Sequence, residues 1–219
     1  MIVSQFLEGL EAADVRVVLD AGTKRRIAPH AIIYEQGTQA NEFFLLTTGH
    51  ARYFSLGPDG RRMLLHWLVP GDILGVVSML RNPATYRVSA EAVQDTSLIV
   101  WSRSTMLSLV DRYPRLVQNA LVVGAGYLDL YIAAYSALVS ETARERLANV
   151  LARLGPAIGR EVPGGVELTV TNEELASAAN ITPFTASRIL SEWQDSSVVT
   201  KRRGRIILHA PGRLFSKTA

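Results

Sequence analysis

The first half of the chain is patterned in short runs of β-branched and aromatic residues that are separated by turn-forming residues. Between about residues 27 and 101, runs such as Glu42–Thr47 and Ala51–Leu56 alternate with glycine-containing breaks, one of which, Gly57–Gly60, has the composition of a hairpin turn. Strands at this spacing are typical of a sandwich, barrel or jelly roll rather than of a parallel sheet with crossover helices. We therefore predict a β domain for this half.

Further along, apolar residues recur at a helical period. The pattern predicts a short helix over residues 102–111 and a long one over residues 114–139, which begins at a proline whose missing N–H would be unpaired there anyway. One stripe of the long helix is apolar at steps of four and three, and we predict that it forms the seam of a dimer. Its members are Leu116, Ala120, Val123, Tyr127, Leu130 and Ala134. The adjacent stripe, which includes Leu128, is apolar too and is expected to cover the chain's own domain, although a buried core helix would show the same pattern.

A pair of short helices joined by a tight turn is predicted over residues 171–193. Thr171 and Glu174 have the spacing of a capping box, and Asn180 stands where the turn needs a left-handed backbone. Thr182 is expected to cap the second helix, with a proline at its first position. The inward side of that helix is expected to be Ala186, Ile189, Leu190 and Trp193. Two short helices across such a turn form a helix-turn-helix, whose second helix fits the major groove of DNA. A third helix, over about residues 141–154, should precede this pair and end at Gly155-Pro156.

A β-hairpin with a basic tip is predicted next. Residues 198–200 and 205–208 are strand-like and flank Lys201-Arg202-Arg203-Gly204, which suits a wing that meets phosphates. We expect Arg188 to read guanine, or else to contact a phosphate, and Phe184 to touch a thymine methyl or to pack on the neighbouring helix. The expected DNA-contacting residues are Thr171, Asn172, Thr182, Pro183, Phe184, Thr185, Ser187, Arg188, Lys201, Arg202, Arg203 and Arg205.

Charge and composition agree with this division. The formal net charge of +3 lies entirely in residues 141–219, because residues 1–140 hold twelve basic and twelve acidic side chains. A neutral front and a basic end suit a sensor joined to an anion-binding module.

The absence of cysteine excludes disulfides, Fe–S clusters on thiolates and a Cys nucleophile. We see no signal peptide and no apolar run long enough to cross a bilayer, so we expect a cytoplasmic protein without a membrane partner.

Several segments resemble the Crp/Fnr family of bacterial transcription regulators. The sensor signature of that family is echoed by Tyr34–Gly37, Phe44–Gly49 and, most specifically, Pro70-Gly71-Asp72-Ile-Leu-Gly75. The helix-turn-helix is similar in spacing throughout, with Arg188 followed by Ile-Leu. The resemblance covers essentially the whole chain and implies an α+β protein that acts as a homodimer on a palindromic site in double-stranded DNA. RNA polymerase would be a further partner of an activator.

The resemblance also implies a domain order. Residues 1–113 would be a cyclic-nucleotide-binding-like sensor (a double-stranded β-helix, or jelly roll), residues 114–139 a dimerisation helix and hinge, and residues 140–219 a winged helix-turn-helix.

The expected effector pocket departs from that of the cyclic-nucleotide-binding members. Val76 stands where those members have a ribose-binding Glu, and Tyr86-Arg87 occupies the place of their phosphate-binding Arg-Ser pair. A ribose hydroxyl against Val76 would lose its acceptor, at a cost of about 1–3 kcal/mol, so we do not expect cAMP or cGMP, although a one-residue register shift would let Arg87 bind an anion. The predicted pocket comprises Gly71, Val76, Val77, Ser78, Tyr86, Arg87, Tyr127 and Tyr131. Either an apolar effector or a pocket filled by its own side chains fits this set, and the cofactor stays unknown.

Other chemistries find little support. Haem is not expected, because the four histidines are scattered, and no metal site is predicted. The chain has no Gly-x-Ser-x-Gly, His-Glu-x-x-His or Walker-type motif, so we do not expect an enzyme. The main alternative is an effector-binding module that regulates a protein partner without touching DNA. Charge reversal at Arg202 and Arg203 separates the two hypotheses, because only a DNA-binding regulator would lose DNA affinity and salt dependence.

Overall fold

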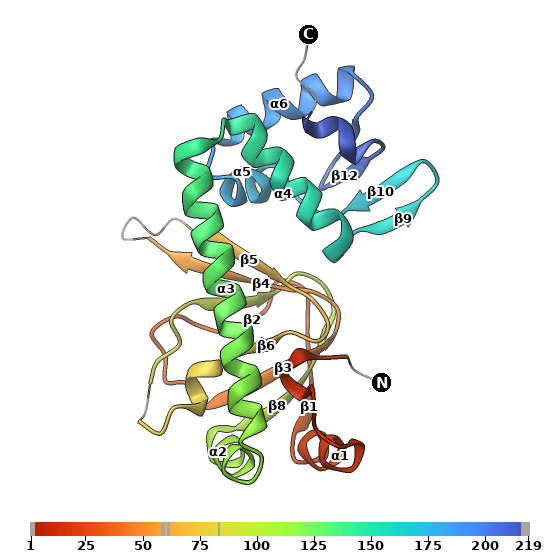
Figure 1. The fold of residues 1–219 in the computed structure, drawn as a ribbon. Helices are drawn as coiled ribbons and strands as arrows, with labels where there is room; N and C mark the ends of the chain where they lie inside the picture. Colours follow the sequence, from red (N-terminus) through yellow and green to blue (C-terminus); the bar gives the residue numbers. More distant parts are fainter. Residues whose placement is uncertain (1–2, 58–59, 61, 83, 216–219) are drawn as a thin grey trace. The chain divides into compact units, whose positions relative to one another are not determined.

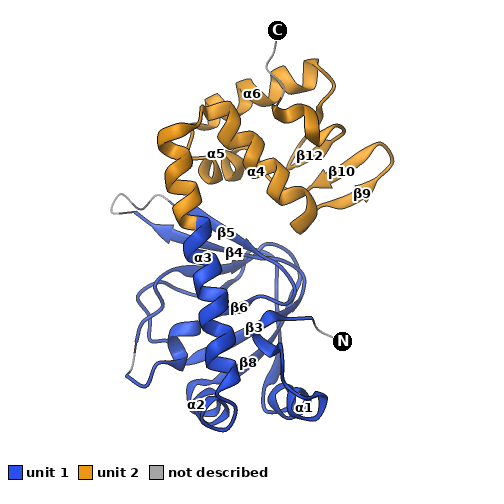
Figure 2. Ribbon diagram, viewed as in Figure 1, with its two compact units in different colours: residues 1–130 blue, residues 131–219 orange. Residues whose placement is uncertain are grey.

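The structure is a computed structural model, and it describes residues 3–57, 60, 62–82 and 84–215 (Figure 1). The chain forms two compact units, residues 1–130 and 131–219 (Figure 2). The division lies inside one long helix, between Leu130 and Tyr131, so that this helix contributes to both units.

The front unit contains two four-stranded antiparallel sheets, with strand orders β1-β8-β3-β6 and β2-β7-β4-β5. The strands are β1 (Thr23–Ile27), β2 (Ile32–Tyr34), β3 (Glu42–Thr48), β4 (Ala51–Leu56), β5 (Arg62–Leu68), β6 (Ile73–Leu74), β7 (Ser89–Ala92) and β8 (Thr96–Ser102). The predicted hairpin is present as the antiparallel pair β4–β5, while Pro58 and Asp59 of its turn lie outside the described residues.

Strand β3 shows how the layers are built. Phe44 and Leu46 belong to the core between the two sheets, which they share with Tyr53 of β4. Phe43 and Leu45 belong to a second core, on the other face of β3. Because both faces of the strand are buried, its sequence is apolar without alternation.

Helices cover the outer face of the sheet that contains β3. They are α1 (Ala12–Asp20), α2 (Arg103–Arg112), the first turns of α3 (Arg115–Ser140) and the 3₁₀ turns η1 (Gln5–Leu7) and η2 (Val76–Met79). Asn119 of α3 is buried, and its Nδ2 donates to the carbonyl oxygens of Phe6 (2.9 Å) and Glu8 (2.8 Å). These two hydrogen bonds fix the N-terminal turn to the long helix.

The faces of α3 differ from the prediction. Leu116 and Ala120 are 0% and 3% exposed and belong to the outer core, and Val123 and Tyr127 pack against the two cores. The stripe predicted as a dimer seam therefore covers the chain's own β domain along this part of the helix. The adjacent stripe is exposed instead. We call it the exposed α3 stripe, and its large members are Val117, Leu121, Leu128, Tyr131, Tyr135 and Leu138. Both stripes are apolar, so the helical period alone could not tell which one meets the sheet.

A second difference concerns membranes. Within the described part of the chain, α3 is the one helix long and apolar enough to cross a bilayer by length and composition, although the sequence was expected to hold no such run. Asp129 lies exposed near the middle of this helix.

In its described residues, the back unit combines the last turns of α3 and three further helices with a four-stranded antiparallel sheet of order β11-β12-β10-β9. Its elements are α4 (Ala143–Ile158), β9 (Arg160–Val162), β10 (Gly165–Leu168), α5 (Asn172–Ala178), α6 (Pro183–Asp195), β11 (Val199–Arg202), β12 (Arg205–Leu208) and the 3₁₀ turn η3 (Pro211–Phe215). Buried residues of α4, α5 and α6, among them Leu151, Leu175 and Trp193, form the centre of this unit.

Helix α4 is longer than predicted. It continues past Pro156 to Ile158, because a proline removes only one backbone donor and the last turn keeps the bond from the Gly159 amide to the Gly155 carbonyl (3.1 Å). The chain then turns into the β9–β10 hairpin, which was not predicted. Its two strands have three and four residues, too short for a periodic signal.

Candidate nucleic-acid interface

The first helix of the predicted pair, α5, starts with the expected reciprocal cap. The Thr171 amide donates to the Glu174 carboxylate (2.6 Å), and the Glu174 amide donates to the Thr171 hydroxyl (3.1 Å). Asn180 follows with a φ of 49°, which is the left-handed conformation expected in the turn. The local signals in the sequence thus specify this corner of the chain.

Arg146 of α4 holds the same corner from the other side. Its guanidinium donates to the carbonyl oxygens of Ala179 (2.9 Å) and Asn180 (3.4 Å), just after α5, and to that of Glu141 (2.7 Å), just after α3. A helix leaves its last carbonyl groups unpaired and carries partial negative charge at that end, so a cation is favourable there. One side chain therefore completes the ends of two helices.

Helix α6 buries the side that the sequence predicts and exposes part of the expected outward side. Thr182 caps it by accepting a bond from the Thr185 amide (3.1 Å), and the two hydroxyl oxygens lie 2.8 Å apart. The residues expected to face inward, Ala186, Ile189, Leu190 and Trp193, are at most 2% exposed. Thr182, Pro183, Phe184 and Arg188 are exposed, while Thr185, Ser187 and Asn172 of α5 are half-buried. Phe184 is 80% exposed, so within this chain it does not pack into a core.

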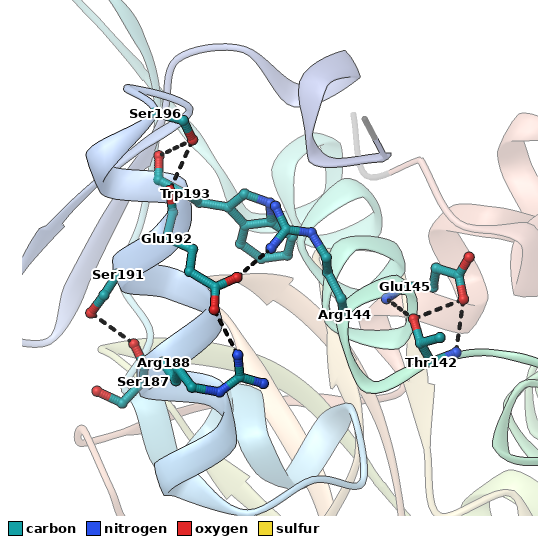
Figure 3. Close-up of polar contacts among 9 residues, drawn as sticks. All are labelled: Thr142, Arg144, Glu145, Ser187, Arg188, Ser191, Glu192, Trp193 and Ser196. Carbon is teal, nitrogen blue, oxygen red and sulfur yellow. Dashed lines mark hydrogen bonds and ion pairs between the residues drawn. The ribbon is translucent and has the colours of Figure 1, made fainter. Parts of the chain in front are cut away.

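An ionic network connects α6 to α4 (Figure 3). Glu192, one turn after Arg188, accepts a bond from Arg188 Nη1 (2.6 Å) on one oxygen and from Arg144 Nη1 (2.7 Å) on the other. The guanidinium of Arg144 lies 5.0 Å from the centroid of the buried Trp193 ring. The expected base-reading arginine is therefore held by a carboxylate, a feature that the sequence reasoning did not anticipate. The i,i+4 spacing of Arg188 and Glu192 was the available signal for that contact.

The wing forms as a two-residue hairpin whose strand β11 extends to Arg202, directly opposite Arg205. Gly204 takes a φ of 69° in the turn, where a glycine is needed. Arg202 and Arg203 are exposed at the tip. The wing thus presents two of its basic residues at its end.

The other two basic residues of the wing contact their own unit. Lys201 donates to the Ser191 hydroxyl of α6 (2.9 Å), and Arg205 lies 3.5 Å from the carboxylate of Glu167 on β10. A hydrogen bond from Arg160, with the charge of Arg205 nearby, lowers the pKa of Glu167. Lys201 and Arg205 thus brace the wing against its own unit.

The residues predicted for an effector pocket lie in different surroundings. Val76 packs against the outer core and Val77 against the inner one, while Arg87 is exposed. Ser78 is fully buried, and Tyr131 lies in the back unit at 41% exposure.

Tyrosines fill the interior between the sheets. Tyr86 is 5% exposed, and its ring stacks on that of Tyr34 with centroids 3.9 Å apart. Its hydroxyl donates to the Glu42 carbonyl (2.9 Å) and accepts from the Glu42 amide (3.2 Å). Burial raises the pKa of Tyr86. Tyr86 therefore acts as a structural side chain inside the β domain.

A cavity of about 360 Å³ does exist in the front unit, and Gly71 and Tyr127 of the predicted set line it. Its other walls come from the N-terminal segment Val3–Gln5, His66, Pro70, Asp72 and the α3 residues Val123, Gly126 and Leu130. Ser4 closes one side by donating to the Gly71 carbonyl (2.6 Å). Most of its walls are not among the predicted pocket residues, because they lie far apart along the chain. Among the described residues there is no cluster of three His, Asp or Glu side chains that could hold a metal ion.

Comparison with known proteins covers both units. Residues 24–113 match the model of the cyclic nucleotide-binding domain, and residues 145–216 match that of the Crp-like helix-turn-helix domain. The cyclic AMP receptor protein of Thermus thermophilus is 27% identical over 93% of this chain and 91% of its own length, and the nitrogen fixation regulation protein FixK of Azorhizobium caulinodans is 26% identical over 90% and 79%.

Solved structures agree. The c-di-GMP-responsive global regulator CLP of Xanthomonas campestris has a TM-score of 0.80 at 19% identity, covering 91% of this chain and 99% of that one. FixK2 of Bradyrhizobium japonicum has a TM-score of 0.76 at 25% identity, covering 90% and 98%. Together with the capped helix-turn-helix and the jelly-roll sheets, these matches show that the chain belongs to the Crp/Fnr family of DNA-binding transcription regulators.

Proposed function

We propose that this regulator binds a palindromic DNA site as a homodimer, with α6 in the major groove and the β11–β12 wing on the flanking phosphates, and that cAMP does not control it. The observation that carries the proposal is the outward side of α6, where Thr182, Phe184 and Arg188 are exposed in the same unit as Arg202 and Arg203. Polar and cationic side chains on a capped helix suit base edges, and cations on a hairpin tip suit phosphates.

The exposed α3 stripe supports the dimer. Leu121, Leu128 and Tyr135 are 68%, 59% and 72% exposed on a helix whose other side is packed on its own domain. A contiguous apolar surface of this kind is expected to be covered by another protein surface or by lipid. A second copy of the same helix fits better than a bilayer, because the helix joins two folded units and exposes Asp129 near its middle. A twofold dimer of this kind would bind half-sites about one DNA turn, roughly 34 Å, apart. We place the protein in the cytoplasm, where that DNA lies.

Independence from cAMP is supported by the side chains of the front unit. Val76 packs on the outer core and offers no acceptor for a ribose hydroxyl, and Arg87 is exposed. Tyr34 and Tyr86 fill the space between the sheets. Calorimetric titration with cAMP should give no saturable binding at micromolar concentration, and a micromolar dissociation constant would overturn this part of the proposal.

Selection of binding sites from random duplex DNA by the purified protein, without added effector, tests the proposed function as a whole. An enriched palindrome is the expected result, because the selection reports sequence preference and half-site spacing together. The matched variant reverses the charge at the wing tip, Arg202→Glu with Arg203→Glu, and should lower the affinity for the selected site and flatten its salt dependence. No enrichment by a folded dimer would favour the alternative, an effector-binding module that acts on a protein partner. We propose a regulator without enzymatic activity, for which RNA polymerase is a further partner if the selected site lies where activators bind.

A further inference from the structure

An acidic residue, Glu192, lies on α6 one turn beyond the last of its expected DNA-contacting residues, Arg188. Both carboxylate oxygens of Glu192 are engaged, one by Arg188 at 2.6 Å and one by Arg144 at 2.7 Å (Figure 3). A carboxylate near DNA phosphates is unfavourable, so its presence on this helix calls for a role of its own.

The two arginines are not equivalent. The side chain of Arg144 is 25% exposed, and its guanidinium lies against the fully buried ring of Trp193. The side chain of Arg188 is 60% exposed. Arg144 is therefore the fixed end of the network, and it holds Glu192 in a position from which Glu192 can hold Arg188.

The bond to Glu192 leaves Arg188 able to recognise a base. A guanidinium has five N–H groups, and reading guanine through O6 and N7 uses two of them. An arginine whose orientation is already fixed loses less freedom when it docks, which favours the one geometry it is fixed in. The neighbouring negative charge also cancels much of the attraction of Arg188 for phosphates at arbitrary sequences.

We propose that Glu192, anchored by Arg144, is the positioning residue that sets sequence specificity: it orients Arg188 for a base and suppresses its binding to phosphates elsewhere. The inference rests on the proposed function, because it presumes that α6 contacts DNA. It adds a residue that touches no base but determines how strongly the selected site is preferred over other DNA.

The experiment compares Glu192→Gln with the wild-type protein on two probes, the duplex selected by the wild type and a scrambled duplex of equal length. Loss of the carboxylate should strengthen binding to the scrambled duplex and steepen the slope of log affinity against log salt concentration by about one. The ratio of the affinity for the selected duplex to that for the scrambled duplex should fall about three- to tenfold. Arg144→Gln leaves the carboxylate but removes its anchor, and should lower the ratio in the same direction by a smaller factor.

A matched control separates specificity from charge. Glu161→Gln removes one exposed carboxylate from β9 in the same unit and should change the ratio by less than about twofold. In a double-mutant cycle, Arg188→Ala should abolish the effect of Glu192→Gln, since the effect is exerted through Arg188. Thermal melting of each variant identifies any loss of folding.

The outcomes are distinct. A wild-type protein that enriches no sequence overturns the proposed function and this inference with it. If the wild type enriches a site, but Glu192→Gln and Glu161→Gln prefer it over the scrambled duplex to the same degree, the inference alone is overturned. An effect of Glu192→Gln that persists in the Arg188→Ala background also overturns it, because the carboxylate would then act by charge and not through Arg188.

Discussion

Replacing Leu128 by glutamate should dissociate the dimer. Leu128 lies in the exposed α3 stripe and is 59% exposed in the single chain, so more than half of its surface remains to be covered by a partner. The substitution places a charge where the proposed interface is apolar. It leaves the contacts between α3 and the β domain in place, because Leu128 lies outside both cores.

The magnitude follows from the area that the partner must cover. Full burial of a leucine side chain gains about 1.5–3 kcal/mol, so the part still exposed on Leu128 contributes roughly 1–2 kcal/mol in each protomer. A twofold interface contains the residue twice, which gives about 2–4 kcal/mol and weakens the dimer about 30- to 1000-fold. Two carboxylates facing each other in a dry interface add to that loss.

Sedimentation velocity at micromolar concentration measures the effect directly. Val122→Glu is the matched control, because Val122 is 54% exposed on the same helix but lies about 120° around its axis from Leu128, on the side of Asp129. The wild type and Val122→Glu should sediment as dimers and Leu128→Glu as a monomer. If Leu128→Glu remains dimeric at the same concentrations, the exposed α3 stripe is not the interface.

Three further predictions concern single side chains. Asn119→Leu leaves the carbonyls of Phe6 and Glu8 without their buried donor and should cost the front unit about 1–3 kcal/mol in urea unfolding; a loss below about 0.5 kcal/mol would contradict the role given to those bonds. Burial raises the pKa of Asp72 above its ordinary 3.8, so the folded state binds more protons than the unfolded state above that pH, and stability should fall as the pH rises from about 4. Asp72→Asn should flatten this slope in urea titrations between about pH 4 and 7, and an unchanged slope would assign it to other groups. Phe184→Ala should leave the melting temperature unchanged, because the ring is 80% exposed, and should weaken binding to the selected site about five- to tenfold; unchanged affinity would remove this ring from the interface.

The helix-turn-helix could be predicted in detail because its signals are local. Thr171 with Glu174, the left-handed Asn180, and Thr182 before a proline each determine a backbone conformation within four residues of themselves. Side-chain periodicity then determined which face of α6 is buried, since only one of its faces is apolar. The Glu192 network could not be predicted from local signals, because Arg144 comes from another helix.

The orientation of the long helix was harder to predict, because it depends on contacts between distant parts of the chain. Two adjacent stripes of α3 are apolar, and which of them meets the sheet depends on how residues such as Phe6 and Met106, distant in sequence, pack beneath it. The effector pocket stays a prediction for a related reason. Its residues were carried over from motif positions, whereas the cavity lined by the N-terminal segment and the Pro70–Asp72 turn depends on contacts between distant parts of the chain.

Arg146 gives the back unit a mechanical property. Its guanidinium joins the carbonyl that follows α3 to the two carbonyls that follow α5, directly ahead of α6. We therefore expect a displacement of the end of α3 to reach the turn before α6 through this one guanidinium group, in addition to the packed core. Substitution of Arg146 by a neutral residue would take this donor away from all three carbonyls at once, and with it the direct link between the two helix ends.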